Sequence, residues 1–323
     1  MKKALVVGID NYGDGNNLAG CINDAVAVAK HLKRHKNGDV NYSVNQINDL
    51  QTKDELKEQI QDLFEGNCDS ALFFFSGHGH VDKYGMASLV TPDMTPQSPG
   101  VTMDSILTWA NDSKVKNKII ILDCCFSGYM GSFSGDGSKS MLNDGVTILT
   151  ASKGDQPSQE FGGHGVFTAL LLSALEGGAS DLLGNITPGS IYSYIDKALG
   201  PWRKQRPVFK SNVSTFDVIR KATPLIDVGI LRELPNMFKV NKSIKLDPSF
   251  EDTNTLQDEH IVTEPYAIEE NTKLFKNLQK LTNNGLVRPV GEEHMYYAAM
   301  NSKSCELTPL GEYYLKLAKE GKF

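Results

Sequence analysis

The feature that most constrains the fold is a set of short runs, each with a continuous apolar centre, separated by segments with helical periodicity. The runs begin at Lys3, Ser70, Asn117 and Gly145 and read KALVVGI, SALFFFSG, NKIIILD and GVTILTA. Such a run, without polar alternation, is typical of a strand buried on both faces of a sheet. Strands of this kind that alternate with helices predict an α/β fold with a mainly parallel sheet covered on both sides.

Helical patterns lie between and after these runs. Thr52, with Glu55 three residues later, forms a capping box that predicts a helix over TKDELKEQIQDLF. Segment 207–219, PVFKSNVSTFDVI, alternates well enough to predict a closing strand. The other predicted helices are Asn23–His35, Met103–Asn111, Gly165–Gly177 and Pro188–Leu199.

The character of the sequence changes after Lys221. Pro224, Pro235 and Pro248, with the polar stretch FEDTNTLQDEH, predict a connector that lies over the surface. Beyond it the chain becomes compact again, with a helix in NTKLFKNLQKLTNNGLV that stops at Gly285. The expected parts are a large domain at 1–221, a connector at 222–262 and a small domain at 263–323.

The small C-terminal domain shows a helix, a strand, a turn, a strand and a helix, an order that resembles a winged helix of the α+β class. From His260 to Phe323, eight Lys and Arg residues are balanced by eight Glu. Lys273, Lys276 and Lys280 could line a helix face toward phosphates, but a solvated face is the commoner explanation. We therefore favour a protein-interaction or regulatory module over a DNA-binding one.

Composition argues against several classes of protein. The formal net charge of -6 and pI near 5.7 give no global attraction to nucleic acid. The apolar residues within MKKALVVGIDNY are too few for a secretory signal, and no apolar run approaches the roughly 20 residues of a membrane span. Five cysteines without a C-x-x-C pair argue against disulfides and against a zinc site. We expect a cytoplasmic protein with reduced thiols, no metal and no membrane contact.

Two segments that follow predicted buried strands carry the groups of a nucleophilic site. SGHGH, Ser76 to His80, places the imidazole of His78 between glycines, and DCCFSG, Asp123 to Gly128, places the thiol of Cys125 just past a strand. Binding sites of parallel sheets lie beyond the carboxyl ends of the strands. A thiol attacks a carbonyl as thiolate and needs an imidazole and backbone oxyanion donors nearby. The amides of Gly79 and Cys125 are the candidate donors.

Four sequence motifs carry a resemblance to a known family. They are GIDNY at Gly8, GCINDA at Gly20, FFFSGHG at Phe73 and LDCCFSG at Leu122. His78 and Cys125 are 47 residues apart, and about 50 separate the corresponding pair in caspases. Over roughly residues 1 to 220, the chain resembles the caspase and metacaspase clan, peptidase family C14, and bacterial caspase-like peptidases in particular.

The resemblance implies a fold and a set of roles. The fold would be a caspase-like three-layer sandwich with a mainly parallel six-stranded sheet, and His78 and Cys125 would be the catalytic dyad. Cys124 would be a buried neighbour of the nucleophile, and His80 a loop residue. Phe126 stands where metacaspases carry a His after the nucleophile. That change leaves the dyad intact because the replaced His is not the base.

A second departure concerns calcium. Many metacaspases bind calcium with an acidic cluster in the segment after the catalytic His. Here Asp82, Asp93 and Asp104 are scattered over that segment. We therefore expect no cofactor and no calcium dependence.

The resemblance also bears on specificity. Asp-directed caspases grip the substrate carboxylate with arginines at two places that hold Asp24 and Asp123 in this chain. Two carboxylates in a partly buried pocket favour a guanidinium or an ammonium, and the matching acids of metacaspases line the pocket for Arg or Lys. Ser152 and Asp155 would add to the pocket wall. Asp24 has a second explanation, a charge that complements the dipole at a helix N-terminus.

We therefore expect a cysteine endopeptidase that cleaves proteins after Arg or Lys and is regulated through its C-terminal domain. Lys139 is the only basic residue of the Gly- and Ser-rich segment Tyr129 to Gly145, where caspases carry a processing linker, and is the candidate autocleavage site. A catalytically inactive scaffold and a DNA-binding regulator remain as alternatives. The presence of both His78 and Cys125 favours the enzyme. Relatives by resemblance include parts of bacterial stress and phage-defence systems.

Overall fold

The computed structural model describes eight stretches of the chain, namely 1–13, 15–125, 141–151, 160–161, 163–201, 206–239, 242–256 and 262–323. They form two compact units, Met1–Thr223 and Pro224–Phe323.

The first unit is built on a six-stranded sheet. The strands follow one another in space as β12 (Val208–Asn212), β8 (Val146–Thr150), β7 (Asn117–Asp123), β3 (Ser70–Ser76), β1 (Lys2–Gly8) and β2 (Ser43–Asn48). All neighbours are parallel except β12, which runs antiparallel to β8. This arrangement confirms the predicted α/β fold with a mainly parallel six-stranded sheet.

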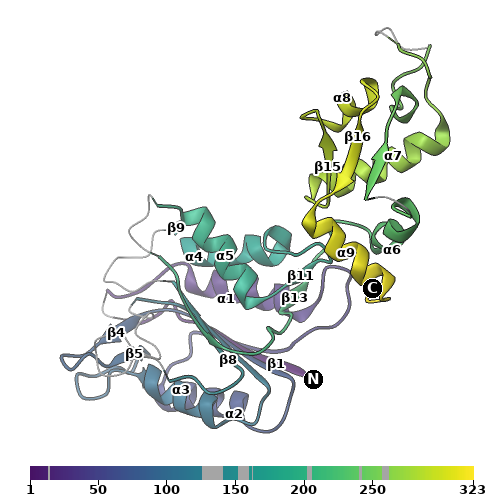
Figure 1. The fold of residues 1–323 in the computed structure, drawn as a ribbon. Helices are drawn as coiled ribbons and strands as arrows, with labels where there is room; N and C mark the ends of the chain where they lie inside the picture. The colour runs from purple at the N-terminus through teal and green to yellow at the C-terminus, as the bar shows by residue number, and fades with distance from the viewer. Residues whose placement is uncertain are drawn as a thin grey trace. The chain divides into compact units, whose positions relative to one another are not determined.

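Helices cover both faces of the sheet (Figure 1). Successive strand residues point to opposite faces, so that Leu72 and Phe74 of β3 join one core and Phe73 and Phe75 the other. The core that contains Leu72 is covered by α1 (Cys21–Lys33), α4 (Val166–Ser173) and α5 (Pro188–Leu199). The opposite core is covered by α2 (Lys53–Phe64) and α3 (Met103–Asp112). Each strand of the sheet centre is therefore buried on both sides, which explains its continuous apolar run.

Short elements decorate the sheet. A three-stranded antiparallel sheet of β4 (Gly79–Val81), β5 (Ala87–Leu89) and β6 (Val101–Thr102) follows directly after β3. A two-stranded pair, β9 (Glu160–Phe161) and β10 (His164–Gly165), precedes α4. A second pair joins β11 (Asn185–Ile186) to β13 (Arg220–Lys221). The helix predicted over 165–177 ends at Ser173 and continues as a π-helical turn, η2 (Ala174–Gly178).

The second unit corrects the predicted connector. Segment 222–262 was expected to lie over the surface, but it contributes α6 (Val228–Met237), β14 (Ser243–Lys245) and η3 (Pro248–Phe250). Leu231 and Leu234 of α6 are buried, and β14 pairs with a later strand. Proline is therefore a poor sign of a connector in this segment. Pro248, for example, begins a helical turn, where its missing N–H costs no hydrogen bond.

The rest of this unit is a small antiparallel sheet with helices. After α7 (Glu269–Asn283) come β15 (Val287–Val290), α8 (Met295–Met300), β16 (Ser304–Leu307) and α9 (Pro309–Lys319). The strand order is β14-β16-β15. The order of helix, strand, strand and helix is the predicted one, but α8 occupies the place of the predicted turn.

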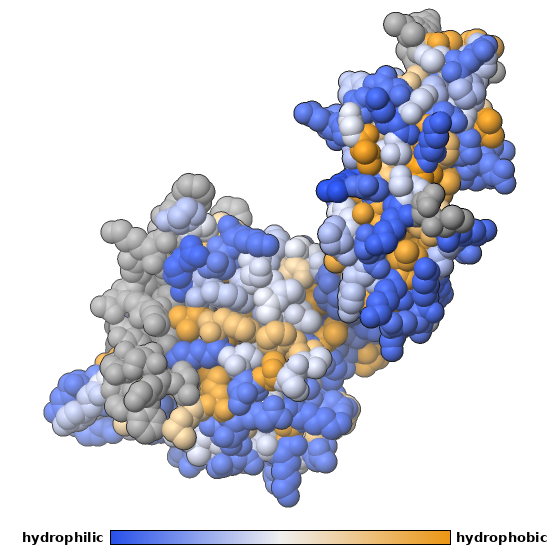
Figure 2. All heavy atoms as spheres, viewed as in Figure 1, coloured by the Kyte–Doolittle hydropathy of each residue, from blue (hydrophilic) through white to orange (hydrophobic). Residues whose placement is uncertain are grey.

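Hydrophilic side chains cover much of the visible surface of each unit, with smaller groups of hydrophobic residues between them (Figure 2). Among the described residues, no helix combines the length and the apolar character needed to cross a bilayer.

Candidate active site

The register of two neighbouring strands brings the two motif segments together. Ser76, the last residue of β3, lies level with Asp123, the last residue of β7. His78 and Cys125 each follow two residues further along parallel strands. Both residues consequently leave the same edge of the sheet and line one cavity.

His78 is held by the loop that follows β1. Its backbone N–H donates to the Tyr12 hydroxyl at 2.9 Å, and the two rings pack with centroids 4.6 Å apart. The imidazole Nε2 lies 2.7 Å from the backbone carbonyl oxygen of Asn16. Because a carbonyl only accepts, Nε2 carries the hydrogen in this pair. Nδ1 is then the ring nitrogen with a lone pair.

Gly79 lies directly against the backbone of Cys125. A Cβ at this position would come within 2.1 Å of the Cys125 carbonyl oxygen, so a side chain does not fit. The Val90 N–H donates to the His78 carbonyl, which makes those two residues a hydrogen-bonded pair of the β4–β5 hairpin. Paired residues alternate in such a hairpin. The Gly79 N–H is therefore directed away from β5.

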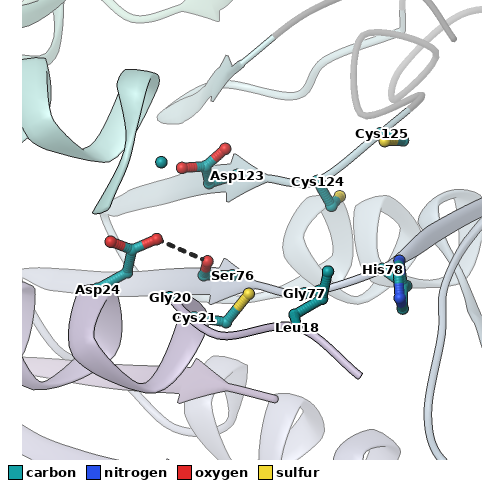
Figure 3. A pocket seen from close by; sticks show the side chains of 11 residues that line it. Leu18, Gly20, Cys21, Asp24, Ser76, Gly77, His78, Asp123, Cys124 and Cys125 are labelled. Carbon is teal, nitrogen blue, oxygen red and sulfur yellow. Dashed lines mark hydrogen bonds between the residues drawn. The ribbon is translucent and has the colours of Figure 1, made fainter. Parts of the chain in front are cut away.

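The cavity between the strand ends has a volume of about 280 Å³ and is shown in Figure 3. Two carboxylates, Asp24 from α1 and Asp123 from β7, face each other at one end of it, and His78 and Cys125 lie toward the other. The remaining lining residues are Leu18, Gly20, Cys21, Ser76, Gly77, Cys124 and Gly165. Four of the predicted site residues, His78, Cys125, Asp24 and Asp123, thus line a single cavity.

Each carboxylate of this cavity is buried and held by hydrogen bonds. Asp24 is 2% exposed, and it accepts from the Ser76 hydroxyl at 3.0 Å and lies 2.7 Å from Nδ1 of His164. Asp123 is 7% exposed and accepts from the Thr168 hydroxyl at 2.7 Å. These partners fix both carboxylates in orientation while leaving them beside the cavity.

Gly165 lies against the two acids. A Cβ there would meet Asp123 Oδ2 at 2.8 Å and Asp24 Oδ2 at 3.6 Å. Any side chain at residue 165 would intrude on the carboxylates. Glycine thus keeps open the space in which the two acids face the cavity.

Burial makes both acids hard to ionise. Burial, together with the negative charge of Asp123, raises the pKa of Asp24 to about 7, although the hydrogen bonds from His164 and Ser76 oppose the rise. Burial also raises the pKa of Asp123, against the hydrogen bonds from Thr168. A cationic group that entered the cavity would stabilise the ionised form of each acid.

Two further cysteines, Cys21 and Cys124, line the same cavity as Cys125. Burial raises the pKa of the Cys21 thiol well above its ordinary value, and the carboxylates of Asp10 and Asp24 add to the rise. Cys124 is 6% exposed and packs in the core on the α2 side of the sheet, as expected for a buried neighbour. None of the five cysteines forms a disulfide.

The sequence analysis missed several residues of this site. Ser76 stood within a motif that had been singled out, and the apolar-strand pattern hid its role because it ends β3. His164 is 140 residues from Asp24 in the chain, and Asn16 is 62 residues from His78. No local pattern links such pairs.

Other predicted residues have different outcomes. Ser152, Asp155 and Lys139 lie outside the described residues. Asp24 does lie in the first turn of α1, so the helix-dipole explanation applies as well, but the side chain faces the cavity. The N-terminus of α1 is bonded by Asp10, which accepts from the backbone N–H of Cys21 at 2.8 Å.

Two of the acids after His78 accept hydrogen bonds from the protein itself. Asp82 accepts from two backbone N–H groups of its own turn, and Asp93 accepts from the Lys53 N–H and the Thr91 hydroxyl. Within the described part of the chain, no three or more His, Cys, Asp or Glu side chains gather as metal ligands would.

Comparison with known proteins agrees with the motifs. Metacaspase-1 of Meyerozyma guilliermondii is 36% identical over 90 residues, which are 25% of this chain and 22% of that protein. Metacaspase-1 of Debaryomyces hansenii is 37% identical over 90 residues, which are 25% of this chain and 20% of that protein. The chain therefore matches only about a fifth of the length of these relatives.

Two solved structures were also found. Caspase-1 from Spodoptera frugiperda has a TM-score of 0.48 at 16% identity and covers 68% of this chain and 90% of its own. A structural-genomics target from Geobacter sulfurreducens has a TM-score of 0.49 at 15% identity and covers 69% of this chain and 97% of its own. The caspase-domain family model matches residues 1–219, well over half of the sequence. The chain belongs to the caspase-domain family.

Proposed function

We propose that this chain is a cysteine endopeptidase that cleaves proteins after Arg or Lys, with His78 and Cys125 as its catalytic dyad. Membership of the caspase-domain family supports the peptidase class. The observation that carries the specificity is the pair of buried carboxylates, Asp24 and Asp123, in the same cavity as the thiol and the imidazole.

The chemistry follows from the way His78 is held. With Nε2–H bonded to the Asn16 carbonyl, Nδ1 accepts the proton of the Cys125 thiol. The thiolate sulfur adds to the substrate carbonyl carbon, and the carbonyl oxygen becomes an oxyanion facing the N–H groups of Gly79 and Cys125. The C–N bond then breaks, Nδ1–H protonates the leaving amine, and an acyl-enzyme remains. Water, deprotonated by His78, hydrolyses the thioester and regenerates the thiol.

Charge and burial favour a basic side chain at P1, the residue on the acyl side of the cleaved bond. An acidic P1 would add a third carboxylate to a cavity where one already raises the pKa of the other. A guanidinium or an ammonium would instead pair with two acids that are already oriented by Ser76, His164 and Thr168.

A panel of fluorogenic peptides that differ only at P1 tests this proposal. We expect turnover of Arg and Lys substrates by the wild type and none by Cys125→Ala. Preference for a P1 Asp substrate would contradict the proposed specificity. Absence of turnover on every peptide, with a folded protein and an alkylation-sensitive Cys125, would favour the scaffold alternative.

A further inference from the structure

A second cavity lies beside the same imidazole. Its volume is about 360 Å³, and it is lined by Tyr12, Asn16, Gly79, His80 and the residues of segment 90–96 other than Asp93. His78 lines this cavity and the acidic one alike. The two cavities therefore meet at the imidazole. Asp24 and Asp123 line only the first cavity, so the proposed specificity for a basic P1 residue gives the second cavity no role.

The position of the second cavity relates it to the leaving amine. When P1 occupies the acidic cavity, the scissile carbonyl lies over Cys125, and the amine departs toward the group that protonates it. That group is His78 in the proposed mechanism. A chain that leaves Cys125 past His78 and Gly79 reaches the cavity formed by Tyr12, His80 and the segment after β5.

Among the described residues, no Lys, Arg, Asp or Glu side chain lines this cavity. Val90, Pro92, Met94 and Pro96 supply apolar surface, and Met94 is 39% exposed. The one acid of this segment, Asp93, is not part of the lining, because its carboxylate accepts from Thr91 and from the Lys53 backbone. An apolar side chain of moderate size would bury its surface here, whereas a carboxylate would meet neither Lys nor Arg among the described residues of the lining.

We propose that this second cavity binds the P1′ side chain, the first residue on the amine side of the cleaved bond, and selects an uncharged, apolar one. This inference rests on the proposed peptidase function and deepens it, since the enzyme would then read both sides of the bond.

Acyl transfer isolates the amine side from the acyl side. A peptide ester with P1 Arg acylates Cys125, and amino-acid amides then compete with water for one and the same acyl-enzyme. The ratio of aminolysis to hydrolysis measures binding of the incoming amine alone. We expect this ratio to be about tenfold higher for leucinamide than for glycinamide or aspartamide, the scale for a few methylenes in an apolar pocket.

Met94→Glu tests the wall, and Met86→Glu is its matched control. Met86 is 44% exposed, lies in the connection between β4 and β5, and does not line the cavity. We expect Met94→Glu to lower the preference for leucinamide about tenfold and to raise that for lysinamide, each measured as the ratio of aminolysis to hydrolysis within the same variant. Met86→Glu should behave as the wild type.

Three outcomes would overturn the inference. The first is that the ratio of aminolysis to hydrolysis does not depend on the amine. The second is that Met94→Glu and Met86→Glu change this ratio equally. The third is that Met94→Glu alters the preference among ester donors that differ at P2 and leaves the preference among amines unchanged. Failure of Arg, Lys and Asp esters alike to acylate Cys125 would overturn the peptidase function itself, and this inference with it. If only the Asp ester acylated Cys125, the proposed P1 specificity would be wrong. The preference among incoming amines could still be measured on that acyl-enzyme.

Discussion

The two cavities that meet at His78 are built in different ways. The acidic one is formed by the ends of buried strands and by the start of α1, and its polar groups are held by hydrogen bonds from several elements. The other is formed by the β4–β5 hairpin and the loop after it, with apolar side chains that reach the surface. The difference fits the roles proposed for them, because a fixed, buried frame suits recognition of a charge and an apolar subsite can be built from a loop.

The largest expected effect removes the group that both cavities share. His78→Ala and Cys125→Ala should each lower kcat/KM by about 10⁴-fold or more, as in other nucleophile–base pairs. Cys124→Ala should retain most of the activity, because Cys124 packs in the core. Circular dichroism would check that the inactive variants are folded. An inactive Cys124→Ala beside an active Cys125→Ala would show that the nucleophile is misassigned.

Removing one acid should weaken recognition of a basic P1 residue and leave binding of the amine unchanged. Asp24→Asn or Asp123→Asn should lower kcat/KM for a P1 Arg peptide roughly 30-fold or more, since breaking a buried charge pair costs about 2 to 5 kcal/mol. The control is Asp104→Asn, in the first turn of α3 and outside the cavity. The amine preference in acyl transfer should stay as in the wild type. A loss of amine preference in Asp24→Asn would mean that the cavities are not separable.

Recognition in the acidic cavity should also depend on pH. Asp24 faces Asp123, Cys21 and His164, and its pKa in the empty enzyme is about 7. Protonation removes the charge that a P1 cation needs, so KM should rise as the pH falls from about 8 to about 6. Asp24→Asn should lose this part of the profile and keep any part due to the dyad. The measurement is KM for an Arg peptide against pH in both proteins.

A smaller effect concerns stability. The pKa of Asp24 is higher in the folded chain than its ordinary value of 3.8, so the fold binds its proton more tightly than the unfolded chain does. The stability due to this group is full below about pH 4 and is lost as the pH rises through about 7. At pH 8, Asp24→Asn should therefore raise Tm by roughly 2 to 4 °C. At pH 4.5 the gain should shrink, and an equal gain at both pH values would contradict this account.

The smallest expected effect on turnover is self-processing. Autocleavage, if the enzyme uses it, should occur after Lys139, which would suit the acidic cavity. Intact masses of wild type, Cys125→Ala and Lys139→Ala after incubation would show a cut in the wild type alone. A fully active and uncut wild type would rule the idea out.

The sequence could predict the parts of the fold and site whose signals are local. Continuous apolar runs located the central strands, and the motifs at their ends located His78 and Cys125. Strand β2, SVNQIN, was not predicted, because it lies at the edge of the sheet and its exposed residues break the apolar pattern. His164, Thr168 and the second cavity depend on packing between distant segments, which hydropathy and spacing do not encode.

One segment of the chain touches every part of this machinery. Tyr12 and Asn16 hold the imidazole and line the apolar cavity, and a few residues later Cys21 and Asp24 line the acidic one. A displacement of this stretch would change proton transfer, charge recognition and amine binding in a single movement. Under the proposed mechanism the three properties are coupled through this loop, and a molecule that binds the loop after β1 would inhibit all of them.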